Sequence, residues 1–110
     1  MRKFVLDEIN RSDMEKIRDY LNENAILSEV DGLYWVELDE EDLDHLQFGH
    51  EQCKPYRFAV ELCDDSVHLE MLIRSATTMR CECIKYANRT QRDVIIRFGE
   101  TLIRDCEITT

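Results

Sequence analysis

The spacing of apolar residues predicts an amphipathic helix near the start of the chain. Its apolar positions are Met14, Ile17, Leu21 and Ala25. A spacing of three and four residues places these side chains on one face of a helix, with the charged residues between them facing away. The segment from Ser12 to Glu15 has the sequence of a capping box, in which the first and fourth residues satisfy each other's backbone amides. We therefore predict that Ser12 caps this helix and that the helix ends near Asn24.

A broader apolar face predicts a second helix near the end of the chain, capped by Thr90 with Asp93 in its first turn. Its members are Val94, Ile95, Phe98, Gly99, Leu102, Ile103 and Cys106. They cover about half of the helix circumference at ~100° per residue, so this helix needs more than one packing partner. We expect the sheet on one side, and the first helix or a second subunit on the other. Gly99 costs about 1 kcal/mol against alanine in a helix interior, which predicts a close approach of another element there.

Alternating apolar and polar residues predict β-strands between the two helices. Residues 26–38 read as a hairpin, because Asp31-Gly32 is typical of the two-residue type I′ turn. In its second strand, alternation assigns Tyr34, Val36 and Leu38 to the core and Trp35 to the outer face.

The remaining strands are expected on both sides of this hairpin. Residues 3–9 predict an edge strand or an extended arm, and residues 56–62 and 67–74 predict an antiparallel pair around a tight turn. Residues 77–87 are either a third strand of this meander or a knuckle followed by a turn. The fold class is therefore α+β in two layers, with an antiparallel sheet of four to five strands packed by an N-terminal and a C-terminal helix. We expect residues 1–110 to form a single domain.

Acidic residues are concentrated in the first half of the chain, and their charge bears on which partners the protein could bind. The net charge is −10, and charged residues make up 35% of the chain against a usual ~25%. Residues 1–55 carry 6 Lys+Arg and 15 Asp+Glu, and six of the eight residues from Glu37 to Asp44 are acidic. Such a chain repels phosphate backbones, which argues against nucleic acid and favours another protein as the partner. A homodimer through the C-terminal helix is the alternative partner.

Five cysteines and the hydropathy of the chain bear on its location. No stretch approaches the ~18 apolar residues of a membrane-spanning helix, and the N-terminal apolar run is too short for a signal peptide. An odd number of cysteines argues against a disulfide framework. We therefore expect a cytoplasmic protein whose cysteines are metal ligands, core residues or reactive thiols.

Two short motifs predict a metal site. His50 and Cys53 are separated by two residues, and Cys81 and Cys83 are separated by one residue. Three thiolates and one imidazole are the ligand number and type of a closed tetrahedral Zn²⁺ site. On a strand, residues 81 and 83 would point to the same face, so both sulfurs could reach one ion.

Other residues near these motifs offer alternatives. Cys63 or His45 could take the place of one ligand, whereas Cys106 lies on the apolar face of the last helix and is expected in the core. The thiolate-rich site would carry a net charge of −1, which Lys54, Arg80 and Lys85 could offset. The competing interpretation is a set of ordinary buried cysteines, which behave as small apolar residues.

The sequence lacks a recognisable catalytic frame. It has no glycine-rich phosphate loop, no Gly-x-Ser-x-Gly and no His-Glu-x-x-His. Four protein ligands leave no open metal position, which favours a structural zinc site over a catalytic one. The resulting hypothesis is a small zinc-binding interaction or regulatory module. The alternative is a thiol-based redox-responsive zinc protein or a catalytic zinc enzyme.

Overall fold

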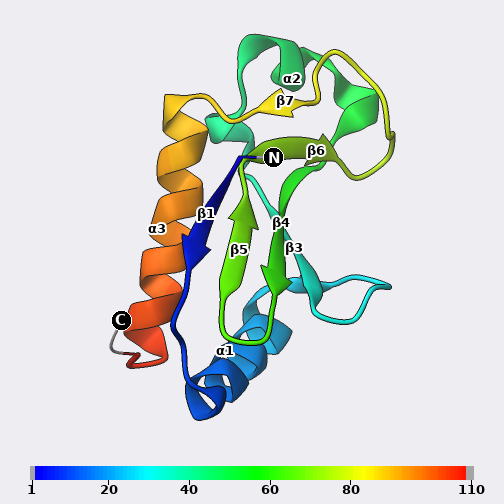
Figure 1. The fold of residues 1–110 in the computed structure, drawn as a ribbon. Helices are drawn as coiled ribbons and strands as arrows, with labels where there is room; N and C mark the ends of the chain where they lie inside the picture. The colour runs from blue at the N-terminus through cyan, green and yellow to red at the C-terminus, as the bar shows by residue number, and fades with distance from the viewer. Residues whose placement is uncertain (1, 109–110) are drawn as a thin grey trace.

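The structure is a computed structural model that describes residues 2–108, and it has the predicted α+β architecture (Figure 1). The helices are α1 (Arg11–Asn24), α2 (His45–Gly49) and α3 (Arg89–Asp105), with short 3₁₀ turns η1 (Glu40–Asp42) and η2 (Glu51–Cys53). The strands are β1 (Lys3–Leu6), β2 (Ile26–Leu27), β3 (Leu33–Glu37), β4 (Tyr56–Leu62), β5 (Val67–Glu70), β6 (Leu72–Ser75) and β7 (Lys85–Tyr86). The predicted fold class, with its N-terminal and C-terminal helices, is confirmed.

All strand pairs of the sheet are antiparallel. The order along the sheet is β1-β5-β4-β3-β2, while β6 continues on β4 and pairs with β7. Residues 3–6 therefore form the predicted edge strand, with Phe4 opposite Leu69. The sheet has seven strands rather than four to five, because β2 and β7 are two-residue strands and one predicted strand is divided in two.

The division of the strand predicted at 67–74 is produced by a change of register against β4. Val60 pairs with Leu69, but Arg57 pairs with Arg74, so residues 70–73 lie opposite only residues 58–59. Such a bulge bends the strand and redirects the residues after it. Two extra residues leave the alternation of inward and outward side chains unchanged, so the alternation contains no sign of the bulge.

Both long helices begin earlier than their predicted caps. Asn10 caps α1 by accepting the Asp13 amide, and the Ser12 hydroxyl only reaches the Asn10 side chain at 3.3 Å. Asn88 caps α3 in a complete capping box with Gln91, so the Thr90 prediction was wrong. In both cases an asparagine supplies the capping oxygen and places the predicted residue inside the helix.

The predicted type I′ hairpin is also wrong, although its two strands pair. Only two residues of the first strand enter the sheet, where Leu27 pairs with Tyr34, so five residues form the connection. Within this loop, Gly32 has positive φ (+81°), whereas Asp31 does not, and a type I′ turn requires both. The Ser28 hydroxyl instead closes a local turn by accepting the Val30 amide at 3.1 Å.

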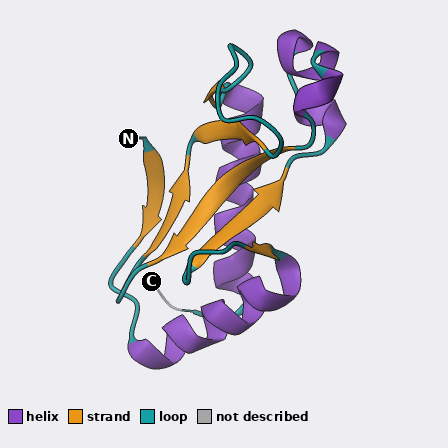
Figure 2. Cartoon of the chain, turned by 90° about the vertical axis from the view of Figure 1, so that its right-hand side faces the viewer, coloured by secondary structure: helices purple, strands orange, loops and turns teal. Residues whose placement is uncertain are grey.

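The hydrophobic core lies between the sheet and helices α1 and α3. Tyr34 and Leu38 are buried as predicted, together with Phe58, Ile95 and Leu102. Helix α3 runs behind the sheet, and the opposite sheet face carries no helix within residues 2–108 (Figure 2). None of the helices in that described part of the chain combines the length and apolar character needed to span a bilayer.

Two of the contacts expected of α3 are present. A Cβ atom on Gly99 would lie 3.0 Å from the Phe4 ring and 3.5 Å from Leu69, which is the predicted close approach of helix and sheet. Phe98 lies between the sheet and α1, with ring centroids 6.0 Å from Phe58 and 6.5 Å from Tyr20. The broad apolar face is therefore shared by the sheet and the first helix.

Candidate metal centre

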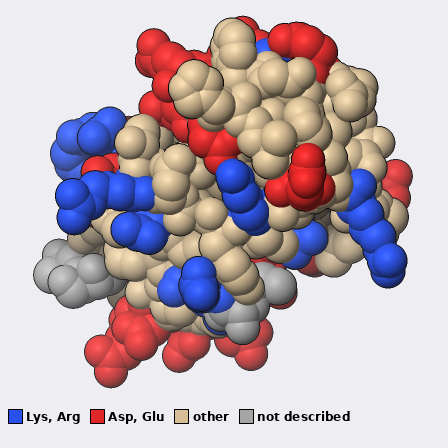
Figure 3. Space-filling view, turned by 90° about the horizontal axis from the view of Figure 1, so that it is seen from above, with Lys and Arg blue, Asp and Glu red and all other residues tan. Residues whose placement is uncertain are grey.

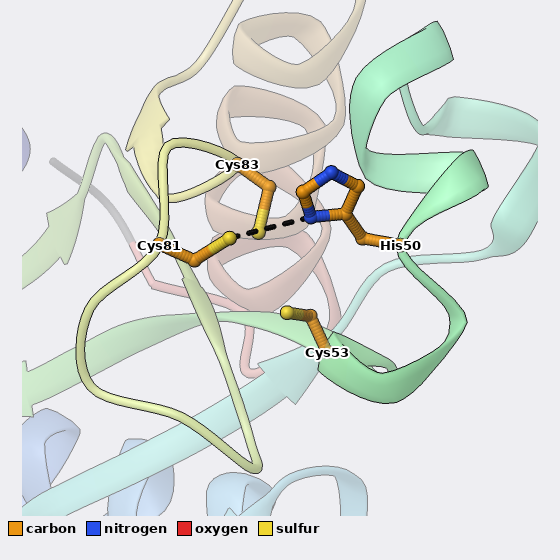
Figure 4. A group of neighbouring side chains, drawn as sticks. All are labelled: His50, Cys53, Cys81 and Cys83. Atoms are coloured by element: carbon orange, nitrogen blue, oxygen red, sulfur yellow. Dashed lines mark hydrogen bonds between the residues drawn. The ribbon is translucent and has the colours of Figure 1, made fainter.

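His50, Cys53, Cys81 and Cys83 come together (Figure 4), at the end of the molecule that carries α2 and β7 (Figure 1). His50 ends α2 and precedes η2, and Cys53 closes η2. Cys81 and Cys83 lie in the loop between β6 and β7. All four side chains point toward one another from these two segments, which are separated by β4, β5 and β6 in the sequence.

The distances between the ligand atoms suit a single ion. One atom from each of the four residues lies within 4.8 Å of all the others, and His50 Nδ1 is 3.3 Å from Cys81 Sγ. A tetrahedron with bonds of ~2.3 Å has edges of ~3.8 Å. The cluster is therefore near the size that a metal requires, and side-chain rotation can supply the remaining contraction. The arrangement could hold a metal ion.

Burial differs within the cluster. Cys53 and Cys83 are buried, at 3% and 0% exposed, whereas His50 and Cys81 are half-buried. A pair of buried cysteines would by itself suit a plain apolar core. The approach of a half-buried imidazole and a half-buried thiol to the same point favours a ligand set instead.

The thiols of Cys81 and Cys83 have different pKa values. A hydrogen bond from the Cys83 backbone lowers the pKa of Cys81 to about 7, and the Cys83 thiol and His50 act in the same direction. Burial raises the pKa of Cys83 to about 11. Metal ligation requires thiolates, so an ion entering this cluster has to displace the proton that burial keeps on Cys83.

The hydroxyl of Tyr56 lies next to one of the sulfurs of the cluster. Its oxygen is buried and has no hydrogen-bond partner within residues 2–108, but it lies beside the Cys83 thiol. Burial raises the pKa of Tyr56, and the neighbouring Cys83 raises it further, so the phenol keeps its proton. That proton is available to the Cys83 sulfur once the sulfur is a thiolate, which is the state that a bound metal imposes.

Cys81 and Cys83 lie in a tight turn and not on a strand, which corrects the predicted geometry. The Ile84 amide bonds the Cys81 carbonyl at 3.0 Å, and regular pairing resumes only at Lys85. Of the two forms considered for residues 77–87, the knuckle is therefore correct, with a two-residue strand after it. The turn brings the two sulfurs to one point by curvature of the backbone.

Hydrogen bonds fasten the two segments that carry the cluster to each other. The Ser75 hydroxyl donates to the Cys53 carbonyl, and the Thr77 hydroxyl donates to the Gln52 carbonyl at 2.6 Å. The Ala76 amide donates to the Pro55 carbonyl at 2.9 Å. These three hydrogen bonds hold the two segments side by side and so position the four side chains.

Two buried glutamines connect this site to helix α3. Gln47 and Gln91 are 0% and 1% exposed, and Gln91 Nε2 donates to Gln47 Oε1 at 2.7 Å. Gln47 Nε2 donates to the Cys83 carbonyl at 3.1 Å, and Gln91 Nε2 also reaches the Asp42 carbonyl at 3.0 Å. Each glutamine is also the fourth residue of a capping box, begun by Asp44 in α2 and by Asn88 in α3.

The prediction missed these glutamines, although a sequence signal for them existed. Asp44 to Gln47 and Asn88 to Gln91 both fit the capping-box pattern. Helix α2 is accordingly capped by Asp44, whereas Asp39 precedes only the 3₁₀ turn η1. The contact between the two glutamines has no counterpart in the sequence pattern, because 44 residues separate them.

Two of the cations near the cluster, Lys54 and Lys85, form ion pairs with carboxylates of neighbouring segments. Lys54 bonds Glu40 at 2.7 Å and Glu51 at 2.8 Å, and Lys85 bonds Asp44 at 2.6 Å. These ion pairs hold the acidic segment against the ligand loops. Figure 3 looks onto this end of the molecule and shows uncharged side chains over much of the surface, with acidic and basic side chains both around and among them.

The alternative ligands lie outside the four-residue cluster. His45 is exposed at the start of α2, and Cys63 lies near Glu61 and His68 at the other end of β4. Cys106 is 9% exposed and belongs to the core, as predicted. The five cysteines are all free thiols in the structure.

Comparison with known proteins does not identify a family for this chain. No protein-family model, curated protein or solved structure matches the chain.

Proposed function

We propose that this protein is a small cytoplasmic zinc-binding module in which His50, Cys53, Cys81 and Cys83 hold one structural Zn²⁺. The observation that carries the proposal is the approach of four ligand atoms, within 4.8 Å of one another, from two separate loops. Three sulfurs and one nitrogen suit zinc, since soft thiolates disfavour Mg²⁺ and Ca²⁺. The ion would clamp the segment after α2 to the β6–β7 loop.

The module's task, in this proposal, is to present a surface to another protein. Large apolar side chains are exposed beside the helix-free sheet face: Leu27 on β2 at 63%, Val30 in the loop after β2 at 61%, and Met79 in the β6–β7 loop at 94%. Met79 lies in the loop that the cluster would hold. Grouped apolar exposure of this kind is typical of interaction surfaces. The free cysteines support a reducing compartment.

Metal analysis of the purified protein tests the zinc assignment. We expect one tightly held Zn²⁺ per chain, lost in Cys53→Ser and in His50→Ala. His45→Ala is the matched control, because that histidine is exposed and outside the cluster, and it should keep the ion. A protein with no tight zinc, or one in which His45→Ala and His50→Ala behave alike, would contradict the proposal.

A second candidate function is a redox response of the same site. It is favoured by Cys81, which is half-buried and adjacent to His50, so oxidants can reach its sulfur. Hydrogen peroxide would oxidise two ligand thiolates to a disulfide, being itself reduced to water, and the ion would leave. We expect zinc release at low peroxide in this case, measured with a chromogenic chelator. Retention of zinc at peroxide levels that oxidise free cysteine would exclude it.

A further inference from the structure

A second cluster of ligand side chains lies on the β4–β5 hairpin, at the opposite end of β4 from the first. Glu61, Cys63 and His68 each offer one ligand atom, and the three atoms lie within 4.8 Å of one another. We propose that this cluster is a second zinc site with three protein ligands. It is distinct from the four-ligand site of His50, Cys53, Cys81 and Cys83, which is called the clamp below.

The hairpin register explains why these three residues meet. Glu61 and His68 are directly paired across the strands, and the Cys63 amide bonds the Ser66 carbonyl at 2.9 Å two residues further along. Residues 61 and 63 share a face because side chains alternate along a strand. The two strands therefore bring a carboxylate, a thiol and an imidazole to one side of the hairpin.

The state of His68 points to a ligand. Its Nε2 lies 3.1 Å from the hydroxyl of Ser66, a residue that is 8% exposed. Its Nδ1 is buried and has no hydrogen-bond partner within residues 2–108. In the tautomer whose Nε2–H donates to Ser66, Nδ1 carries a free lone pair, which is the form of imidazole that binds metals.

The local charge favours a cation at this position. Glu61 makes no ion pair with the described Lys and Arg residues, and Asp64 and Asp65 stand exposed in the adjoining turn. A thiolate and a carboxylate would neutralise a divalent ion. Carboxylate, imidazole and thiolate together select Zn²⁺ over the hard cations, which take oxygen ligands.

Three protein ligands give this site a property that the clamp lacks. A tetrahedral Zn²⁺ keeps its fourth position for water or an exchangeable ligand, which is the coordination of catalytic and transfer sites. We assign to the hairpin an exchangeable zinc ion, held more weakly than the ion of the clamp because it has fewer thiolates and greater exposure.

A zinc titration followed by amide NMR locates both ions in the intact chain. The first equivalent is expected to shift amides of residues 45–53 and 76–86, and the second to shift those of residues 61–68. Failure of the first shift would contradict the clamp and leave the hairpin site intact. Absence of a second equivalent, or a second equivalent that shifts other residues, would overturn the hairpin site.

Variants then test the ligands of the second equivalent. We expect Cys63→Ser and His68→Ala to abolish it and the conservative Glu61→Gln to weaken it at least tenfold. His45→Ala should bind both equivalents as wild type does. Glu61 is exposed, so Glu61→Gln keeps the test valid if the other two variants misfold. Equal binding of the second equivalent by Glu61→Gln and wild type would overturn the proposal.

Discussion

Removal of zinc from the four-ligand cluster is expected to lower the melting temperature by roughly 15 °C and to loosen only one end of the molecule. A ligand present at a thousand times its dissociation constant stabilises by about 4 kcal/mol, and ~1 kcal/mol corresponds to about 4 °C in a domain of this size. The ligand segments are joined to each other by hydrogen bonds and ion pairs at the edge of the core, so loss of the ion should loosen these segments first.

The main core should survive this treatment. Tyr34, Phe58, Leu69 and Ile95 are fully buried between the sheet and the helices and are not ligands. We therefore expect faster amide hydrogen exchange after chelation in residues 45–53 and 76–86, and continued protection in β3, β4 and β5. This pattern separates a local clamp from a zinc-dependent fold, in which all amides would lose protection together.

The controls for zinc removal are chemical and mutational. Adding back Zn²⁺ should restore the melting temperature, whereas Mg²⁺ should not. Cys81→Ser should melt at the chelated temperature and be insensitive to chelator. Cys106→Ser, a buried cysteine outside the cluster, should remain sensitive to it. An unchanged melting temperature after verified zinc removal would contradict the clamp.

Replacement of Gln47 by alanine is expected to destabilise the protein by about 3 kcal/mol. The Gln47 side chain bonds the Cys83 carbonyl, the Gln91 side chain and the Asp44 amide. Leaving buried partners without a hydrogen bond costs ~1–3 kcal/mol each, and α2 also loses its capping box. Urea unfolding at fixed zinc measures the change as a shift in midpoint with an unchanged slope.

The exposed Gln52 supplies the matched control for this substitution. It lies between His50 and Cys53 but its side chain is exposed, so Gln52→Ala should change stability by less than about 0.5 kcal/mol. Gln91→Ala should lower the free energy of unfolding by as much as Gln47→Ala, because it removes the donor of the same Gln91–Gln47 hydrogen bond. The double variant should lose less free energy of unfolding than the sum of the losses in the two single variants. Full additivity would show that the two glutamines act separately.

Local chemistry explains which parts of the fold could be predicted. The stripe containing Ile17 and Leu21, and the face containing Ile95 and Leu102, follow from the helical period and are buried as expected. The alternation that placed Tyr34 in the core is equally local. Each of these patterns depends only on neighbours a few residues apart, and therefore it can be recognised in the sequence.

Other parts of the fold could not be predicted, because two local signals competed for one position or because the contact joins residues far apart in the chain. Asn10 and Ser12 are two adequate caps for one helix, and the structure uses the earlier one. The bulge before β6 conserves the alternation, so the pattern predicted one strand where the structure has two. The contact of Gln47 with Gln91 joins residues far apart in the chain, and only packing of α2 on α3 brings them together.

The sequence by itself determined the α+β class, the apolar faces of both helices, and the four residue types that could ligate one ion. Only the tertiary structure decided that His50, Cys53, Cys81 and Cys83 converge while His45 lies apart and Cys63 joins Glu61 and His68. Residue type sets which donor atoms a side chain can offer. Which donors share a point depends on turns and strand register, and these are settled by the packing of segments distant in the chain.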